Sequence, residues 1–272
     1  MPLWTPSQIA TQLWLDAADA ATLTLVSSAV SQWNDKSGLS HNFSQTTPAN
    51  RPTTSTLDSK TVVDFDGIND VLTRNANSIG RNVTDATFFW LLRPESINSN
   101  RRFWNSSHGT GVVNARFLQG FNSSSVWRVG GRREDAGSYA EDVSVSASTD
   151  LNSWVLMGFQ YNYSTATLTI YRNGQQVSSG SFLNAGTSSN TDSQVAWLGS
   201  AVGGLTAFYD GKIAECAVIH ADTSTSKRQL IEGYLLWKWG LQANLPSDHP
   251  YKNGAPRYGE GRRQRYAGGY GL

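Results

Sequence analysis

Cysteine, charge and long apolar runs are all scarce in this chain of 272 residues. Its single cysteine, Cys216, excludes a disulfide bond within the chain. It lies in the apolar segment 213–219, where a free cysteine usually packs as a small hydrophobic side chain. Since no nearby base in the sequence would activate a catalytic thiol, we expect Cys216 to be buried and inert.

Charged residues make up 16% of the chain, against roughly 25% in average soluble domains. The surface must therefore be mostly neutral and polar, rich in Ser, Thr and Asn, as in many secreted proteins, adhesins and virion components. The net charge of +1 gives no field that would attract nucleic acid or a membrane surface. We expect neither as a partner.

Targeting segments are also missing from the sequence. No stretch approaches the roughly 18 apolar residues of a membrane span. The opening residues, Met1 to Pro6, lack the basic and apolar regions of a secretory signal peptide. We therefore expect synthesis in the cytoplasm without a signal peptide, with any exterior location reached by another route, such as lysis.

Strand patterns are abundant, beginning with a hairpin in residues 153–177. Its first strand, 153–161, is apolar on both faces as far as Gln160, which predicts a place in the middle of a sheet. The second strand alternates, with Leu168 and Ile170 on one face. Asn173 and Gly174 follow, and this pair is typical of a type I′ turn because both central residues need positive φ. About a dozen such short segments and few helices favour a two-sheet sandwich.

One helix is predicted near the end of the chain. Ser226 and Gln229 have the spacing of a capping box, and Gly240 suits the helix C-terminus. An apolar stripe runs along this helix at Leu230, Tyr234, Trp237 and Leu241. We expect the helix to pack on the outside of the sandwich or over its edge.

Three segments carry a family resemblance: the hairpin from Trp154 to Gly174, Trp197–Ser200 and Phe208–Glu215. Together they resemble the laminin G-like, concanavalin A-like jelly roll, over roughly residues 10–245. The resemblance implies an all-β fold, a two-sheet antiparallel jelly-roll sandwich with a C-terminal helix and an extended C-terminal arm. The expected divisions are an N-terminal segment with a short helix (1–12), the sandwich (13–222), the helix region (223–245) and a basic arm (246–272).

Residues 13–38 and 226–256 further resemble a bacteriophage-associated subgroup of this family. That resemblance implies a non-enzymatic virion structural protein on the outside of the particle, either a capsid decoration protein or a fibre-associated protein. Its partners would be other virion subunits, of capsid or tail, and further copies of itself. The alternative is a glycan-binding adhesin module for attachment to a host surface, and a third hypothesis is a polysaccharide-active enzyme.

Enzymatic motifs are not found. Glycosidases of this fold carry Glu-x-Asp-x-x-Glu along one strand, and no such run exists here. The carboxylate pairs Asp64/Asp66 and Glu141/Asp142 lack the partner glutamate. His220 follows Cys216 by four strand residues, roughly 13 Å, which is too far to share a zinc ion. We expect no catalytic residues and no resident metal.

Calcium is the one cofactor considered, near Asp64, Asp66 and Asp70, because hard cations bind several oxygen ligands. The spacing of these residues is not that of an EF-hand loop. Asp66 and Gly67 also form an ordinary strand-ending turn sequence. A structural turn is favoured, and calcium is the minority alternative.

Two sets of binding residues are expected. Trp104, Trp127 and Tyr139 fall in or near loops and could stack on a glycan, although core packing explains tryptophans equally well. Between Lys252 and Leu272 there are five cations and one anion, a local excess of +4, and almost no aliphatic residue. Such a segment cannot fold alone, so it either frays or orders against a partner. The candidate partner anchors are Arg257, Tyr258, Arg262, Arg263, Arg265, Tyr266 and Tyr270.

Overall fold

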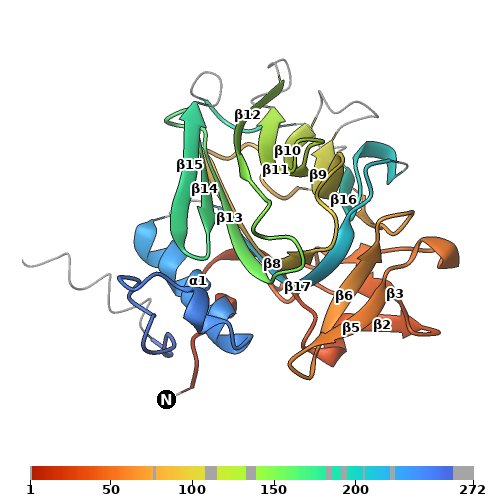
Figure 1. Cartoon of the computed structure of the whole chain (residues 1–272), viewed down its shortest axis with the longest axis horizontal. Helices are drawn as coiled ribbons and strands as arrows, with labels where there is room; N and C mark the ends of the chain where they lie inside the picture. The colour runs from red at the N-terminus through yellow and green to blue at the C-terminus, as the bar shows by residue number, and fades with distance from the viewer. Residues whose placement is uncertain are drawn as a thin grey trace, which may run out of the picture.

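Two antiparallel sheets lie face to face, and one helix covers the outer face of the first (Figure 1). The computed structural model describes residues 2–75, 78–107, 115–132, 139–181, 186–190, 195–204, 206–220 and 224–259. The chain has the all-β jelly-roll fold that the sequence predicts, with the helix outside the sandwich.

The first sheet runs β15–β14–β13–β8–β17, and β17 then pairs with both β1 and β6 at different points along its length. Strand β5 pairs with β6 and adds one more strand to this sheet. The bounds are β15 Gln175–Ser181, β14 Thr167–Arg172, β13 Val155–Asn162, β8 Asp85–Pro94, β17 Asp210–His220, β1 Thr11–Asp16, β6 Lys60–Asp66 and β5 Thr53–Leu57.

The second sheet runs β12–β11–β10–β9–β16–β7–β4–β3–β2, and β3 also bridges β5, which joins the two sheets at one side. Its strands are β12 Tyr139–Ser146, β11 Val126–Arg132, β10 Ala115–Phe121, β9 Arg101–Ser107, β16 Val195–Leu198, β7 Leu72–Arg74, β4 Phe43–Ser44, β3 Ala29–Trp33 and β2 Leu23–Val26. Short 3₁₀ helices span Pro6–Gln8, Ala20–Thr22, Pro48–Asn50, Val202–Gly204 and Gln242–Asn244.

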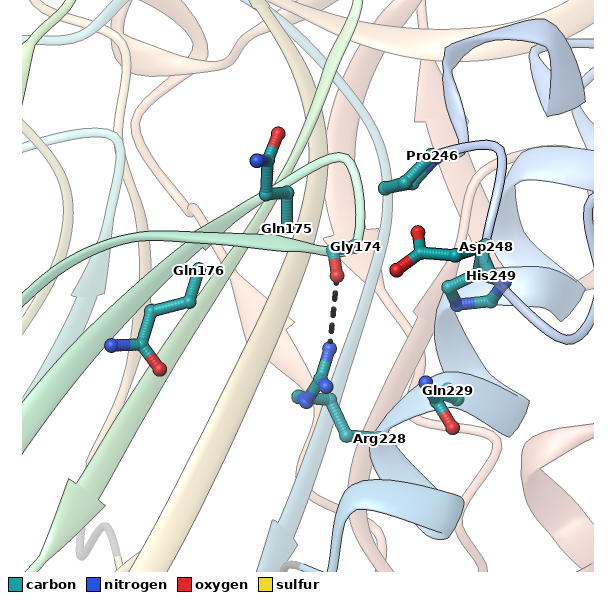
Figure 2. Close-up of a pocket in the computed structure, with 8 residues that line it drawn as sticks. All are labelled: Gly174, Gln175, Gln176, Arg228, Gln229, Pro246, Asp248 and His249. Carbon is teal, nitrogen blue, oxygen red and sulfur yellow. Dashed lines mark hydrogen bonds between the residues drawn. The ribbon is translucent and has the colours of Figure 1, made fainter.

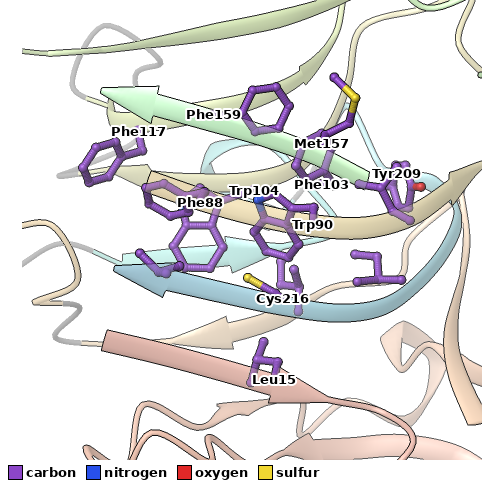
Figure 3. Packing of buried hydrophobic residues seen from close by; sticks show 14 of the residues in the cluster. Leu15, Phe88, Trp90, Phe103, Trp104, Phe117, Met157, Phe159, Tyr209 and Cys216 are labelled. Atoms are coloured by element: carbon purple, nitrogen blue, oxygen red, sulfur yellow. The ribbon is translucent and has the colours of Figure 1, made fainter. Parts of the chain in front are cut away.

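Strand β8 is apolar on both faces because each face meets a different core. Phe88 and Trp90 point between the sheets, where they join the large aromatic cluster shown in Figure 3. Phe89 and Leu91 point outward and pack beneath the helix. The neighbouring β13 lies between β8 and β14, so the prediction of a mid-sheet strand is confirmed.

The β14–β15 turn has the predicted conformation. Asn173 and Gly174 have φ of 51° and 88°, as a type I′ turn requires. Asn173 also bonds back to β13, because its Oδ1 accepts the N–H of Leu156 at 2.9 Å and its own N–H donates to the Leu156 carbonyl at 2.7 Å. These bonds fix the turn relative to the centre of the sheet.

Helix α1 spans Thr225–Lys238, with Ser224 as N-cap, so the predicted capping box at Ser226 is wrong. The Oγ atoms of Ser224 and Ser226 lie 3.3 Å apart and bond each other rather than a backbone N–H. The predicted C-terminus is confirmed: Gly240 has φ of 73° and donates to the Trp237 carbonyl, and the Leu241 N–H donates to the Leu236 carbonyl. This bonding pattern is a Schellman motif.

The two ends of the described chain pair with each other. Leu3 forms a β-bridge with Arg257, the Trp4 N–H donates to the Pro256 carbonyl, and the Tyr258 N–H donates to the Pro2 carbonyl. The first part of the predicted arm, 246–259, is therefore attached to the body of the protein. Within the described residues, no helix is both long enough and apolar enough to cross a membrane.

Candidate functional site: a polar cleft beside the helix

Trp104 and Trp127, the tryptophans predicted to bind a glycan, lie in the inter-sheet core with no exposed surface. The Trp127 ring packs on Phe121, with centroids 4.3 Å apart, and its Nε1 donates to Asp150 Oδ2 at 2.6 Å. Trp104 packs against Phe88 at 5.6 Å. A ring covered on both faces cannot stack on a sugar, so neither tryptophan provides a binding surface.

A strand irregularity explains how β9 buries Trp104. In the pairing of β9 with β10, Gly120 lies opposite Arg102 and Gln119 lies opposite Trp104, so the register shifts by one residue between these two pairs. This leaves Phe103 as the extra residue of a bulge, and both Phe103 and Trp104 join the inter-sheet core. Simple alternation would have placed them on opposite faces.

The remaining predicted binding residues are placed only in part. Tyr139 begins β12, but its side chain lies outside the described residues. Arg257 and Tyr258 are exposed, Tyr258 by 53%. The other predicted partner anchors are all outside the described residues: Arg262, Arg263, Arg265, Tyr266 and Tyr270.

The acidic residues near Asp66 form a hydrogen-bonded turn. Asp66 Oδ1 accepts the N–H groups of Ile68 and Asn69 at 2.8 and 3.2 Å, and Asp70 Oδ2 accepts the Asp66 N–H at 2.9 Å. Asp64 instead forms an ion pair with Lys212 at 3.0 Å. The favoured turn interpretation is confirmed. In the part of the chain that the structure describes, no three His, Cys, Asp or Glu side chains are grouped to hold a metal ion.

Cys216 is fully buried, as predicted, among the residues between the sheets. Burial raises the pKa of its thiol well above the usual range, and the charges of Glu215 and Asp35 add to this effect. A thiol held protonated in an apolar core is a packing group rather than a nucleophile.

A polar cleft of about 240 Å³ opens where three segments meet (Figure 2). The β14–β15 turn forms one wall, the first turns of α1 form the floor, and the segment after the helix forms the other wall. Its lining residues are Gly174, Gln175, Gln176, Arg228, Gln229, Pro246, Asp248 and His249. The turn, the helix and the C-terminal segment are thus brought together from distant parts of the sequence.

The base of this cleft is a buried ionic cluster. Arg228 Nη1 donates to both carboxylate oxygens of Glu232, at 2.7 and 2.8 Å, and to the Gly174 carbonyl at 3.2 Å. The Arg228 guanidinium also lies over the Tyr171 ring, 4.1 Å from its centroid. His249 Nε2 lies 3.2 Å from Glu232 Oε2. The charges at the base are therefore paired, and the side chains that form them are fixed.

The mouth of the cleft has a different character. Gln175, Gln176 and Asp248 are exposed, and Gln229 is half-buried. Each amide can donate and accept hydrogen bonds, and the Asp248 carboxylate accepts them. Among the lining residues, these four side chains can bind a ligand rich in hydroxyl groups without first breaking the buried cluster.

A second cleft of about 310 Å³ lies at the rim of the sandwich. Glu95 in this cleft forms ion pairs with Lys212 at 2.7 Å and with Arg93. The other lining residues are Ser96, Ile97, Asn98, Ser125, Ser148 and Leu151. All of its lining residues come from loops between strands.

The fold and these clefts define a β-sandwich with candidate ligand sites at its surface. A family model described as the concanavalin A-like lectin/glucanases superfamily matches residues 66–226, more than half of the chain, so the protein belongs to this family. No curated protein matches the chain.

Solved structures with the same fold include binding domains of toxins. The binding domain of Paraclostridial Mosquitocidal Protein 1 has 13% sequence identity and a TM-score of 0.58, covering 84% of this chain and 52% of that one. The receptor binding domain of botulinum neurotoxin D has 12% sequence identity and a TM-score of 0.55, and the match covers 82% of this chain and 52% of that one. The botulinum neurotoxin serotype D ligand binding domain in complex with N-acetylneuraminic acid has 13% sequence identity and a TM-score of 0.55. That match covers 82% of this chain and 50% of the other. The chain spans about half the length of these structures, and the likeness is one of fold.

Proposed function

We propose that this protein is a non-enzymatic glycan-binding module and that the cleft in Figure 2 holds the glycan. The observation that carries the proposal is the combination of exposed hydrogen-bonding side chains with a buried, paired base. A sugar presents hydroxyl groups that both donate and accept, which matches the amides of Gln175, Gln176 and Gln229. Because the base is already fixed by its ion pairs, binding a sugar orders few additional groups.

The similar structures support this class of function. One of them is a toxin ligand binding domain in complex with N-acetylneuraminic acid, and two others are named as binding domains. In this chain, the Arg228 charge is neutralised by Glu232, and the exposed Asp248 adds a negative charge at the mouth. The cleft therefore favours an uncharged saccharide over an acidic one.

A glycan array tests the proposal. We expect the full chain to bind at least one glycan, and a Gln175→Ala, Asp248→Ala double variant to bind it at least tenfold more weakly. Both side chains are exposed, so this variant should fold normally. The matched control is Asp58→Ala, which changes an exposed carboxylate that does not line the cleft. No binding by the wild type, or equal binding by the cleft variant, would refute the proposal.

We also propose a location: the outside of a bacteriophage particle, as a capsid decoration protein or a fibre-associated protein. The resemblance of residues 13–38 and 226–256 to phage-associated members of the family supports it. So does the pairing of Pro2–Trp4 with Pro256–Tyr258, because it brings both ends of the described chain to one place, beside the exposed Arg257. We propose that the chain is attached there to capsid or tail subunits, or to further copies of itself.

Deletion of residues 260–272 tests this placement. The deletion leaves the backbone bonds of 256–258 intact, so we expect a melting temperature close to that of the full chain. Incorporation into particles should be lost. A matched variant with Arg257→Ala and Tyr258→Ala should reduce incorporation in the full-length chain. Normal incorporation of the deleted protein would refute a role for this segment.

A further inference from the structure

Three ionisable side chains from distant parts of the sequence meet between α1 and the first sheet. Lys238, in the last turn of α1, places its Nζ 2.5 Å from Asp16 Oδ1 and 2.6 Å from Glu215 Oε2. Asp16 ends β1, and Glu215 lies opposite it on β17, since the two residues are paired in register. One amine therefore contacts two carboxylates on adjacent strands.

Glu215 is enclosed by aromatic groups. Its Oε1 accepts hydrogen bonds from Trp14 Nε1 at 2.7 Å and Tyr234 OH at 2.9 Å, and its Oε2 accepts from Trp239 Nε1 at 2.7 Å. Lys238 Nζ lies 5.5 Å from the ring centroids of both Tyr234 and Trp239. The side chains of Asp16, Glu215 and Lys238 are exposed by 4%, 0% and 18%. Water is therefore largely excluded from the contact between the amine and the two carboxylates.

We propose that Lys238 and Asp16 condense to form an intramolecular isopeptide bond, with Glu215 carrying the protons. The inference is independent of the proposed function. The C–O bond length of about 1.23 Å places Lys238 Nζ within about 3.7 Å of Asp16 Cγ, close to the roughly 3–3.5 Å of a near-attack contact.

The reaction balances without an oxidant or a cofactor. The Lys238 ammonium loses one proton to Glu215, and the free amine attacks Asp16 Cγ as Glu215 returns that proton to an Asp16 oxygen. The C–N bond forms, the nitrogen loses a second proton through Glu215, and one Asp16 oxygen leaves as water. An ammonium and a carboxylate become one amide and one water molecule, and Glu215 ends as it began.

Two neighbouring groups assist these steps. Burial raises the pKa of Glu215, with the charge of Asp16 adding to this and Lys238 opposing it, which suits a carboxyl that must take up and release a proton. Lys36 Nζ lies 2.9 Å from Asp16 Oδ2, on the oxygen that Lys238 does not contact. Its positive charge stabilises the negative charge that develops on that oxygen during attack.

The bond would join the first long strand to the last helix of a chain that has no disulfide. It would connect residue 16 to residue 238 and so close most of the sequence into one covalent loop, which limits the unfolded state. A protein displayed outside a cell or particle gains resistance to unfolding and proteolysis from such a link.

Mass spectrometry of the purified full chain tests the proposal. We expect an intact mass lower than that of the sequence by one water molecule. Protease digestion should release a branched peptide that contains both Asp16 and Lys238. Lys238→Arg keeps a positive charge but removes the nucleophilic amine, so it should show neither change. Glu215→Gln should form the linkage at least tenfold more slowly or not at all.

Two controls separate this bond from other losses of water. Lys60→Arg changes a half-buried lysine paired with Asp58, and should retain the full mass loss and the branched peptide. Cyclisation at an Asp-Gly sequence also removes water, but it would persist in Lys238→Arg. A wild-type chain with its unmodified mass would overturn the proposal, as would a mass loss that survives Lys238→Arg.

Discussion

His249 Nε2 and Glu232 Oε2 lie 3.2 Å apart, and both side chains are only 1% exposed. This contact connects the segment after the helix to α1, and Arg228 on the other side of Glu232 connects α1 to the β14–β15 turn. Glu232 therefore connects the floor of the cleft to both of its walls. The shape of the candidate site depends on a residue that no ligand could touch.

Replacement of Glu232 by glutamine should be strongly destabilising. The variant keeps the size of the side chain but leaves the buried Arg228 without its counter-charge, and breaking such a pair costs about 3–5 kcal/mol. Urea denaturation would measure the change in unfolding free energy. The control is Lys60→Ala, which removes a partly exposed ion pair with Asp58 and should cost at most about 0.5 kcal/mol. Equal effects in the two variants would contradict the role given to Glu232.

Gly174→Ala tests the turn at the edge of the cleft. An added Cβ would lie 3.1 Å from His249 Cδ2 and 3.4 Å from Leu245 Cδ2, at a φ of 88° that disfavours alanine. Backbone strain of about 1–2 kcal/mol should combine with this crowding to lower both stability and glycan affinity. Gly38→Ala is the matched control, with φ of 90° and no atom within 4 Å of the added Cβ. It should show the strain alone and leave glycan binding unchanged.

The sequence predicts the turn and the helix that line this cleft, but not that they lie next to each other. The positive-φ turn at Asn173-Gly174 and the helix containing Arg228 are both visible as local patterns, because each depends on neighbouring residues. Arg228 reaches the Gly174 carbonyl across 54 positions of the chain. That contact depends on how α1 is oriented over the sheet, which is set by its buried apolar face and by the bonds of Tyr234 and Lys238 to Glu215. No spacing in the sequence reports this orientation.

The two tryptophans show a second limit of prediction from the sequence, which concerns single residues rather than contacts between segments. Trp104 and Trp127 fall in or near loops in the sequence-based prediction, yet both are core residues. Residue type does not distinguish a buried tryptophan from one that stacks on a ligand. The bulge that turns Phe103 and Trp104 to the same side arises from the pairing of β9 with β10, which is a tertiary feature.

Trp127→Phe should therefore leave glycan binding unchanged while it lowers stability. Phenylalanine keeps most of the ring packing against Phe121, but it cannot donate the 2.6 Å hydrogen bond to Asp150. Loss of one partner of a buried hydrogen bond costs about 1–3 kcal/mol. Thermal unfolding and glycan affinity, measured well below the melting temperature, check the two expectations. Weaker binding by the fully folded variant would instead support a direct contact of Trp127 with the glycan.

The buried carboxyl of Asp70 should make the stability of the protein depend on pH between about 4 and 6. Burial raises its pKa from 3.8 to about 6, opposed by the hydrogen bond from the Asp66 N–H and reinforced by the charges of Asp66 and Asp64. Because the folded state binds this proton more tightly than the unfolded state, the contribution to stability is present below about pH 4. It is lost progressively as the pH rises through about 6, with a magnitude on the order of 3 kcal/mol for this carboxyl, which is 4% exposed.

Asp70→Asn should remove this dependence and be more stable than the wild type at pH 7. The asparagine carbonyl can still accept the Asp66 N–H, while the cost of burying a charge disappears. Unfolding free energies measured from pH 4 to pH 7 would show a smaller fall with rising pH in the variant than in the wild type. Asp58→Asn, at an exposed position, is the control and should follow the wild-type curve. If the unfolding free energy of Asp70→Asn depends on pH as that of the wild type does, Asp70 is not the group that titrates, and another group causes the pH dependence.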